Sequence, residues 1–363
     1  MTKPKNVYDS TGFFVWSPYE EQTRRKHQIV SSYFDLWIKI LGRWSSLNCF
    51  DCFGGCGAYG DVDHPAYGSP ILEAQCIDAN RARLNRDVRL IVIENDHDNI
   101  ENMKIAFERA GTDAHPIYIE DDFDNAINHI LDETNLTPSF FFIDPFGLNI
   151  RYTTLNRIMQ VPKSEMFINF MFNAVNRFLS AGAIERNLTE LYGTDKWKTG
   201  VMLAGRDRER FLLDLYRAQL KKLGDYVYAY PMSFEEQSRT YYYLFHVTMS
   251  SKGCMIMKSV VAAVCDGYLG YRGPTQYTPT LFDSPEARIA DAVAFLMKYC
   301  VGHTLTYGRL IEELADSTPY LEKELRAAVK QLEPSYVTIK RIPNGLGSKR
   351  RKSGVSEQDI LIF

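Results

Sequence analysis

Short apolar runs alternate with amphipathic segments in the first half of the chain, and this alternation constrains the fold more than any other feature. Each run has the length and composition of a buried parallel strand, and each ends in an acidic residue. The runs and their acids are NCF with Asp51, VRLIVI with Glu94, PIYIE with Asp121 and Asp122, and FFFI with Asp144. Strands and helices in this order predict a doubly wound parallel sheet, an α/β fold that binds ligands at the carboxyl ends of its strands.

The first run breaks into glycines. The stretch CFDCFGGCGAY covers residues 49–59 and, with the residue that follows it, contains Gly54, Gly55, Gly57 and Gly60. A backbone almost without side chains at the end of a central strand lets a nucleotide-like cofactor approach closely. A dinucleotide would require G-x-G-x-x-G opening directly into a helix that faces a pyrophosphate, whereas here the next helix is predicted only from about Ser69 and Pro70. S-adenosylmethionine, which has no phosphates, fits this delayed helix better.

The acidic strand ends are candidate contacts for such a cofactor. In this interpretation Asp51 orients the charged end of the cofactor and Glu94 holds its ribose hydroxyls. Asp121 or Asp122 then meets the adenine amino group. Each acid is also explained as a solvated strand end.

The N-terminal region precedes the first run. Residues 1–17 are predicted to be a loosely structured arm whose aromatic residues Phe13, Phe14 and Trp16 pack on the domain, with contact to a substrate as the alternative. An amphipathic helix is predicted from Glu20, and Lys26 and His27 lie near its start. These two side chains either close over the methionine carboxylate or are ordinary exposed helix residues.

A second candidate site is the sequence Asp144, Pro145, Phe146 and Gly147 after the run FFFI. An aspartate at a strand end can accept a hydrogen bond from an exocyclic amine, and the proline fixes the adjacent backbone carbonyl for another. An aromatic ring can stack on a base that has left its helix. Aligning that amine with the cofactor's methyl group is mainly a matter of positioning. The alternative is a strand-terminating turn with a core phenylalanine.

The chain is predicted to have two domains. Residues 1–275 form the α/β domain, with a helical insertion at about 177–224 and an antiparallel strand pair that closes the sheet. Residues 276–363 contain three predicted helices and two short strands, the order of a winged helix-turn-helix domain. The predicted wing carries the basic run Lys349, Arg350, Arg351 and Lys352. This run contacts nucleic-acid phosphates or is a solvated loop.

Composition limits the alternatives. The 363 residues carry a formal net charge of −3, so nucleic acid would have to be held by a local basic patch. Seven cysteines are an odd number, which favours reduced thiols, and Cys49, Cys52 and Cys56 have no evident fourth ligand for a metal. No apolar run approaches a membrane span and the start lacks a signal-peptide pattern, so we expect a cytoplasmic protein without membrane association and without a metal.

Together these motifs resemble the three-Cys-motif partner family (TcmP) of S-adenosylmethionine methyltransferase-like proteins. The resemblance covers nearly the whole chain and rests on KH at 26–27, DCFGGCGAY, GSP at 68–70, IEND, the acidic pair before Phe123, and IDPFG. It implies a Rossmann-like class I methyltransferase sheet, a C-terminal winged helix, and association with a separate three-Cys-motif protein. It also implies cofactor contacts from Phe53, Gly54, Gly55, Gly57, Tyr59 and Ser69.

More distantly, residues 26–147 are similar to the bacterial large-subunit ribosomal RNA adenine-N6 methyltransferases. The resemblance implies that Asp144 is the catalytic acid, with Pro145 and Phe146 beside it. The family's loop is usually Asp-Pro-Pro-aromatic, whereas here Phe146 stands at the second proline and Gly147 at the aromatic position. Phe53 replaces a histidine of the glycine turn.

Three functions therefore stay open. The first is methylation of a base in RNA or DNA, which the intact Asp51, Glu94 and Asp144 favour. The second is a catalytically altered binding or scaffold protein that acts with its partner, which the changed DPFG loop favours. The third is methylation of a small molecule or a protein, with residues 177–224 forming the pocket.

Overall fold

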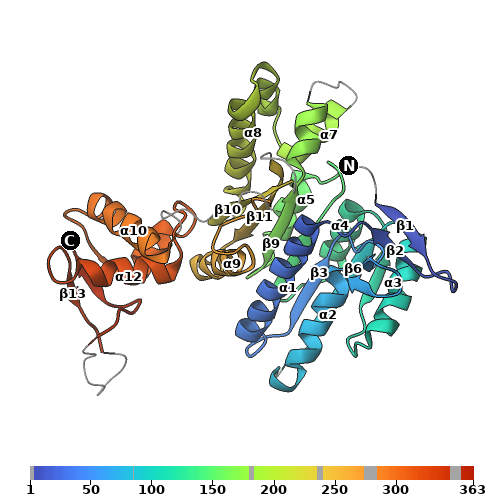
Figure 1. Cartoon of the computed structure of the whole chain (residues 1–363), viewed down its shortest axis with the longest axis horizontal. Coiled ribbons are helices and arrows are strands. Elements are labelled where there is room, and N and C mark those ends of the chain that lie inside the picture. Colours follow the sequence, from blue (N-terminus) through green and yellow to red (C-terminus); the bar gives the residue numbers. More distant parts are fainter. Residues whose placement is uncertain (1–3, 85, 180–183, 235–239, 274–283, 344–352) are drawn as a thin grey trace. The chain divides into compact units, whose positions relative to one another are not determined.

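The computed structural model describes residues 4–363 except 85, 180–183, 235–239, 274–283 and 344–352 (Figure 1). The chain forms two compact units. The first comprises residues 1–249 and 270–274, and the second comprises residues 250–269 and 275–363.

The first unit is built on a seven-stranded sheet. Across the sheet the strands are β10 (Tyr226–Ser233), β11 (Thr240–Thr248), β9 (Glu165–Phe170), β8 (Ser139–Ile143), β3 (Leu47–Asp51), β6 (Val88–Glu94) and β7 (Ile117–Glu120). All neighbouring pairs from β9 to β7 are parallel, while β11 is antiparallel to both β9 and β10. The predicted α/β fold with a mostly parallel sheet and a closing antiparallel pair is confirmed.

Helices cover both faces of this sheet, because successive side chains of its buried strands point to opposite sides. On β8, Phe140 packs against Phe34 and Trp37 of α1, whereas Phe141 belongs to the core on the opposite face. The first face carries α1 (Glu21–Leu41), α2 (Ser69–Asn80) and α3 (His97–Ala110). The second carries α4 (Phe123–Glu133), α5 (Tyr152–Ile158) and α8 (Gly205–Leu220). The sheet is therefore doubly wound.

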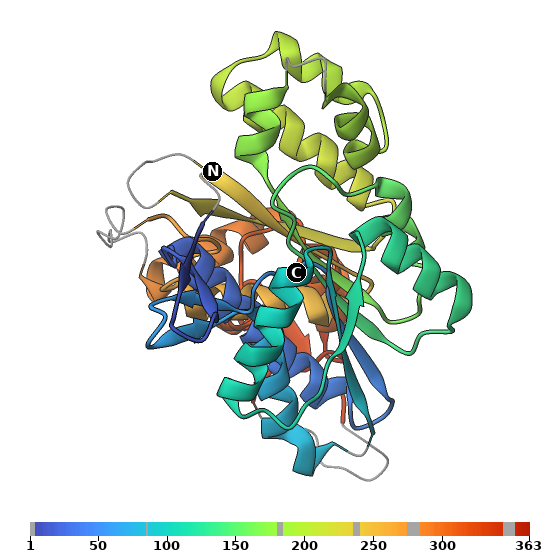
Figure 2. The same cartoon turned by 90° about the vertical axis from the view of Figure 1, so that its right-hand side faces the viewer.

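A group of helices follows β9, in the region where a helical insertion was predicted. It consists of α6 (Phe172–Phe178), α7 (Glu185–Tyr192), the 3-10 helix η3 (Lys196–Met202) and α8. Figure 2 shows α7, η3 and α8 gathered at one end of the sheet, in yellow-green. Their apolar side chains Leu188, Trp197 and Tyr216 join the core beneath the sheet. The insertion starts earlier than predicted, because β9 ends at Phe170 and α6 begins two residues later.

The prediction of a loosely structured N-terminal arm is wrong. The strands β1 (Lys5–Tyr8) and β2 (Phe14–Ser17) form a hairpin, and β2 pairs in parallel with β4 (Ala58–Gly60), which pairs with β5 (Pro65–Tyr67). These four strands form a second small sheet. The glycine turn therefore leads first into β4 and β5, which explains the delayed start of α2. The expected packing of Phe13, Phe14 and Trp16 is confirmed, since all three are buried.

The glycines of the turn are required by the protein's own packing. A Cβ on Gly54 would lie 2.4 Å from Val92 Cγ1, and one on Gly55 would lie 2.9 Å from the Trp16 ring. Gly57 has a φ of +79°, and a Cβ there would lie 2.9 Å from Met103 Cγ. Both the left-handed backbone and the close approach of α3 thus exclude a side chain at Gly57.

We expect Gly57→Ala to destabilise the first unit by about 3 kcal/mol, because it adds a steric clash to an unfavourable backbone conformation. Gly111→Ala is the matched control. Gly111 has a φ of +63° with no atom within 4 Å of an added Cβ, so about 1 kcal/mol should be lost there. Urea denaturation of both variants measures the difference, and equal losses would contradict the role of Met103.

The second unit contains α9 (Ser251–Val264), α10 (Pro285–Tyr299), β12 (Thr304–Thr306), α11 (Tyr307–Leu314), α12 (Glu322–Leu332), β13 (Thr338–Lys340) and β14 (Ile360–Ile362). The three strands form one antiparallel sheet in the order β12-β14-β13. Three helices and two strands were predicted after residue 276, and β12 is additional. Helix α9 groups with this unit because the Lys258 ammonium, fully buried, donates to the carbonyls of Thr318 and Tyr320.

Within the described part of the chain, no helix has the length and apolar character needed to cross a membrane.

Candidate active site

The carboxyl ends of the parallel strands border two clefts. The first, here called the acidic cleft, has a volume of about 490 Å³ and is lined by Phe53, Glu94, Asp121 and Asp122 together with residues of α4, α7 and the loop after β8. The second, here called the aromatic cleft, has a volume of about 760 Å³. Its lining includes Trp16, Lys26, Tyr59, Asp144, Pro145, Phe146, Asn169, Tyr241 and Tyr242. Of the fifteen predicted site residues that the structure describes, nine therefore line one of the two clefts.

In the acidic cleft, Glu94 ties the end of β6 to the glycine turn. Its Oε2 accepts a hydrogen bond of 2.8 Å from the Gly55 backbone N–H, and its Oε1 accepts one of 3.0 Å from the Asp96 N–H. The Asn99 side-chain amide also donates to Oε1, at 3.4 Å. The carboxylate is thus fixed in orientation, and Oε2 keeps acceptor capacity for a ligand.

The two acids after β7 differ in their environment. Asp122 is the N-cap of α4 and accepts hydrogen bonds from the backbone N–H and side-chain amide of Asn125. Asp121 accepts one hydrogen bond, 2.7 Å long, from the Asp122 N–H. Helix capping therefore accounts for Asp122, and Asp121 is the better candidate for a ligand contact.

Phe53 stacks on Phe123 with ring centres 5.5 Å apart. Another part of the lining of the acidic cleft was not predicted. It consists of Arg151 and Arg186, both paired with Glu190, and the amides Asn149 and Asn187. These residues come from loops and from the helical insertion, where the sequence carries no motif that marks them.

In the aromatic cleft, both oxygens of Asp144 accept hydrogen bonds. Lys26 donates to Oδ2 in a short ion pair, and Asn169 donates to Oδ1 at 2.6 Å. Lys26 is 6% exposed, and its ammonium lies 5.6 Å from the centre of the Tyr242 ring. The Asn169 Oδ1 is buried and has no hydrogen-bond partner among the described residues. The Asp144 side chain is 17% exposed, so an amine that enters this cleft would meet the Asp144 carboxylate, whereas the Asn169 Oδ1 beside it is covered by protein atoms.

Asn169 was missed by sequence reasoning, although a signal for it exists. Asn169 lies at the end of β9, and Asp144 lies just after the end of the neighbouring parallel strand β8. The rule that ligands bind at strand ends would have selected it.

Aromatic rings line the same cleft as Asp144 and Asn169. Phe146 is 50% exposed, and its ring lies edge-to-face on Trp16 with centres 5.2 Å apart. Trp16 also packs on Tyr59, and Tyr241 packs beside Tyr242. A planar group entering the cleft would thus find ring faces on several sides.

Lys26 and His27 are adjacent in sequence but play different parts. The His27 ring packs against Tyr19 and Tyr59, and its Nδ1 lies 3.0 Å from the Tyr19 hydroxyl. Burial lowers the pKa of His27 to about 3, so the ring is neutral. His27 lines neither cleft, whereas Lys26 lines the aromatic cleft.

Two buried carboxyl groups lie behind the glycine turn. Burial raises the pKa of Asp51 to about 7, against the effect of a hydrogen bond from the Ser69 hydroxyl. Ser69 begins α2 without capping it, since Gly68 is the N-cap. Glu73 of α2 is fully buried, and burial together with the charge of Asp51 raises its pKa well above the usual value. Asp51 Oδ2 and both Glu73 oxygens lack hydrogen-bond partners among the described residues, although Glu73 touches the Cys49 thiol.

The three clustered cysteines are buried free thiols. Cys56 Sγ donates to the Ala58 carbonyl at 3.0 Å, and Cys52 Sγ contacts the Phe50 carbonyl at 3.7 Å. Over the described residues, no group of three or more histidine, cysteine, aspartate or glutamate side chains is arranged to hold a metal.

The predicted phosphate contacts Lys349, Arg350, Arg351 and Lys352 lie outside the described residues.

No protein-family model and no curated protein matches the chain. Among solved structures, it resembles a SAM-dependent methyltransferase from Agrobacterium tumefaciens at 10% identity, with 69% of this chain and 71% of that chain covered and a TM-score of 0.37. It resembles Trm1 from Pyrococcus horikoshii, solved with S-adenosyl-L-methionine, at 14% identity, with 67% and 61% covered and a TM-score of 0.36. It also resembles the O-methyltransferase TomG from Streptomyces achromogenes at 12% identity, with 64% of this chain and 92% of that chain covered and a TM-score of 0.36. With TM-scores below 0.5, these similarities carry no argument about function, which rests on the site itself.

Proposed function

We propose that the chain is an S-adenosylmethionine-dependent methyltransferase that methylates an exocyclic amine of a base in nucleic acid. The observation that carries this proposal is the Asp144 carboxylate, which follows β8 in a cleft of aromatic rings. A carboxylate acceptor among ring faces matches the donor edge and the flat face of an aromatic amine.

The residues present fit the cofactor. A turn whose glycines permit close backbone approach lies beside Glu94, whose oriented carboxylate suits a pair of ribose hydroxyls. Phe53 and Asp121 border the same cleft, in position for an adenine ring and its amino group. The buried and unpartnered Asp51 Oδ2 suits a cationic group near the turn. Bound there, the cofactor would supply an activated methyl group.

The chain's own residues would position the acceptor. Asp144 accepts a hydrogen bond from the amine, which turns its nitrogen lone pair to one side. Lys26 and the Asn169 amide hold the carboxylate in place for this task. Phe146, which is half-exposed, stacks on the base. The contribution of the protein is mainly orientation.

Replacing Glu94 with alanine is expected to weaken S-adenosylmethionine binding ten- to hundredfold, the usual range for losing hydrogen bonds to a charged group. Titration calorimetry measures the change. Glu120→Ala is the matched control, because Glu120 pairs with Glu94 in the strand register but lies outside the acidic cleft and binds His97 instead. Equal affinities for wild type and Glu94→Ala, or no binding at all, would overturn the cofactor assignment.

A second candidate function is a methyltransferase-like scaffold without turnover. One observation favours it: both Asp144 oxygens already accept hydrogen bonds from protein groups. We also propose, from the sequence motifs, that the chain belongs to the three-Cys-motif partner family and binds a separate three-Cys-motif protein. A scaffold would bind that partner while transferring no methyl group to RNA or DNA.

We also propose that the second unit is a winged helix that holds nucleic acid. Its α10, α11, α12 and three-stranded sheet support this assignment. The basic run Lys349, Arg350, Arg351 and Lys352 would then contact phosphates from the wing.

A further inference from the structure

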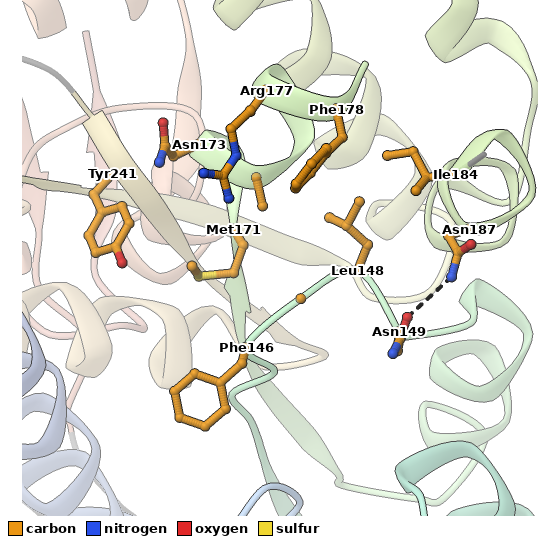
Figure 3. Close-up of a pocket in the computed structure, with 12 residues that line it drawn as sticks. Phe146, Leu148, Asn149, Met171, Asn173, Arg177, Phe178, Ile184, Asn187 and Tyr241 are labelled. Carbon is orange, nitrogen blue, oxygen red and sulfur yellow. Dashed lines mark hydrogen bonds between the residues drawn. The ribbon is translucent and has the colours of Figure 1, made fainter. Parts of the chain in front are cut away.

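A third pocket lies between the two clefts (Figure 3). It shares Phe146, Met171, Asn173 and Tyr241 with the aromatic cleft, and Asn149 and Asn187 with the acidic cleft. We call it the Arg177 pocket. Its volume is about 220 Å³, which is below the range of pockets that hold whole cofactors or drug-sized molecules. It therefore has room for a small part of a ligand that extends from a neighbouring cleft.

Arg177 is the one charged side chain among the described residues that line this pocket. It forms no ion pair with any described side chain, and its guanidinium lies 4.7 Å from the centre of the Phe178 ring. Figure 3 shows the guanidinium directed into the pocket. Arg208 of α8 provides a contrast, because it donates to the carbonyls of Gly200 and Leu203 and to Asn176. The guanidinium of Arg177 can thus bind an anion, whereas that of Arg208 is occupied by protein acceptors.

The other walls suit a flat ring with a polar edge. Phe146 and Phe178 are 50% and 38% exposed, and Leu148 and Ile184 line the same pocket. Asn187 donates to Asn149 Oδ1 at 3.1 Å, drawn as the dashed line in Figure 3. This bond leaves the Asn187 oxygen and the Asn149 amino group for other partners.

We propose that the Arg177 pocket binds the nucleotide next to the one whose base enters the aromatic cleft. Arg177 contacts the phosphate that joins the two nucleotides, and Phe178 stacks on the neighbouring base. Phe146 borders both cavities and so separates the two bases. The inference rests on the proposed function and adds to it that the acceptor is a single-stranded segment of at least two nucleotides, because a free base or nucleoside would leave this pocket empty.

The residues that the Arg177 pocket shares with the aromatic cleft favour a nucleic-acid strand as its ligand over one end of the cofactor. Four of its lining residues are shared with the cleft that holds Asp144, including the Phe146 ring beside the acceptor. A guanidinium on an aromatic face is a recurring arrangement for phosphate and base recognition. The cofactor's cationic end is assigned to Asp51 at the end of β3, on another element.

The test measures binding of a fluorescein-labelled single-stranded 12-nucleotide RNA, and of DNA of the same mixed sequence, by anisotropy at several salt concentrations. We compare wild type, Arg177→Gln and Phe178→Leu. The matched control is Arg210→Gln, since Arg210 is 85% exposed on α8 and lines none of the three cavities described. Affinity for S-adenosylmethionine is measured on the same proteins by calorimetry.

Arg177→Gln is expected to weaken oligonucleotide binding three- to tenfold and to reduce the salt slope by about one. Phe178→Leu should weaken binding at least fivefold with an unchanged salt slope, because it removes stacking but no charge. Arg210→Gln should match wild type, and all variants should keep the wild-type affinity for S-adenosylmethionine.

Oligonucleotide binding by Arg177→Gln equal to wild type would overturn the inference while leaving the proposed function intact. Weaker S-adenosylmethionine binding by Arg177→Gln would also overturn it, because Arg177 would then hold the cofactor. Loss of cofactor binding in wild type itself would instead refute the proposed function.

Discussion

Asp144→Ala is expected to lower the rate of methyl transfer by about 10²- to 10⁴-fold, the range for removing a group that orients a reacting proton donor. The affinity for S-adenosylmethionine should change little, since Asp144 lines the aromatic cleft and not the acidic cleft. Transfer of tritium from labelled cofactor into nucleic acid measures the rate. A rate within threefold of wild type would remove Asp144 from the mechanism.

A stability control accompanies this experiment. Removing Asp144 leaves the ammonium of the buried Lys26 without its ion-pair partner, which costs about 3–5 kcal/mol when such a charge stays buried. The double variant Lys26→Met/Asp144→Leu removes both charges and should recover most of that loss in urea denaturation. If the double variant is folded and still inactive, lost chemistry explains the effect. Recovery of activity in the double variant would show that Asp144 acts only through stability.

Glu73→Gln is expected to make the protein more stable than wild type, by a margin that grows with pH. Burial raises the pKa of Glu73, so the folded state keeps this carboxyl protonated while the unfolded chain ionises it above a pKa of about 4.3. The unfolded state therefore binds fewer protons, and wild-type stability falls by about 1.4 kcal/mol per pH unit as pH rises from the unfolded pKa toward the folded one. Glutamine cannot ionise, so the variant lacks this slope.

Urea denaturation at pH 5, 6, 7 and 8 measures the two stability curves. Asp51 adds a similar slope to both proteins up to its pKa of about 7, so the difference between them isolates Glu73. Glu133→Gln, at a side chain 65% exposed on α4, should follow the wild-type curve. A difference between Glu73→Gln and wild type that stays constant with pH would show that Glu73 is ionised in the folded state.

Much of the fold was predictable, because strand ends, glycines and helix periodicity are local signals. The amphipathic segment that follows Glu94 forms α3, with Asp96 as its N-cap and Gly111 in the left-handed conformation at its end. The run FFFI is the central strand β8, buried at every position. These segments alternate in the order expected of a parallel α/β sheet, so this part of the architecture followed from the sequence pattern.

Elements whose partners are distant in sequence were harder to predict. The sequence FVWS of β2 does not indicate that this strand pairs with β4 at Tyr59, because the pairing depends on where the glycine turn positions β4. The same reason hid Arg177, which lines a pocket with Phe146 only because of where α6 begins. The glycines of the turn were read as cofactor contacts, and the structure adds that Val92, Trp16 and Met103 also require them.

Methyl transfer to nucleic acid by the wild-type protein tests the central claim most directly. The protein is incubated with labelled S-adenosylmethionine and total cellular RNA or DNA, and the digested nucleosides are analysed by mass spectrometry. We predict a methyl group on the exocyclic amine of one base, absent from reactions with Asp144→Ala. Binding of S-adenosylmethionine without label in either nucleic acid would contradict the account and favour the scaffold function.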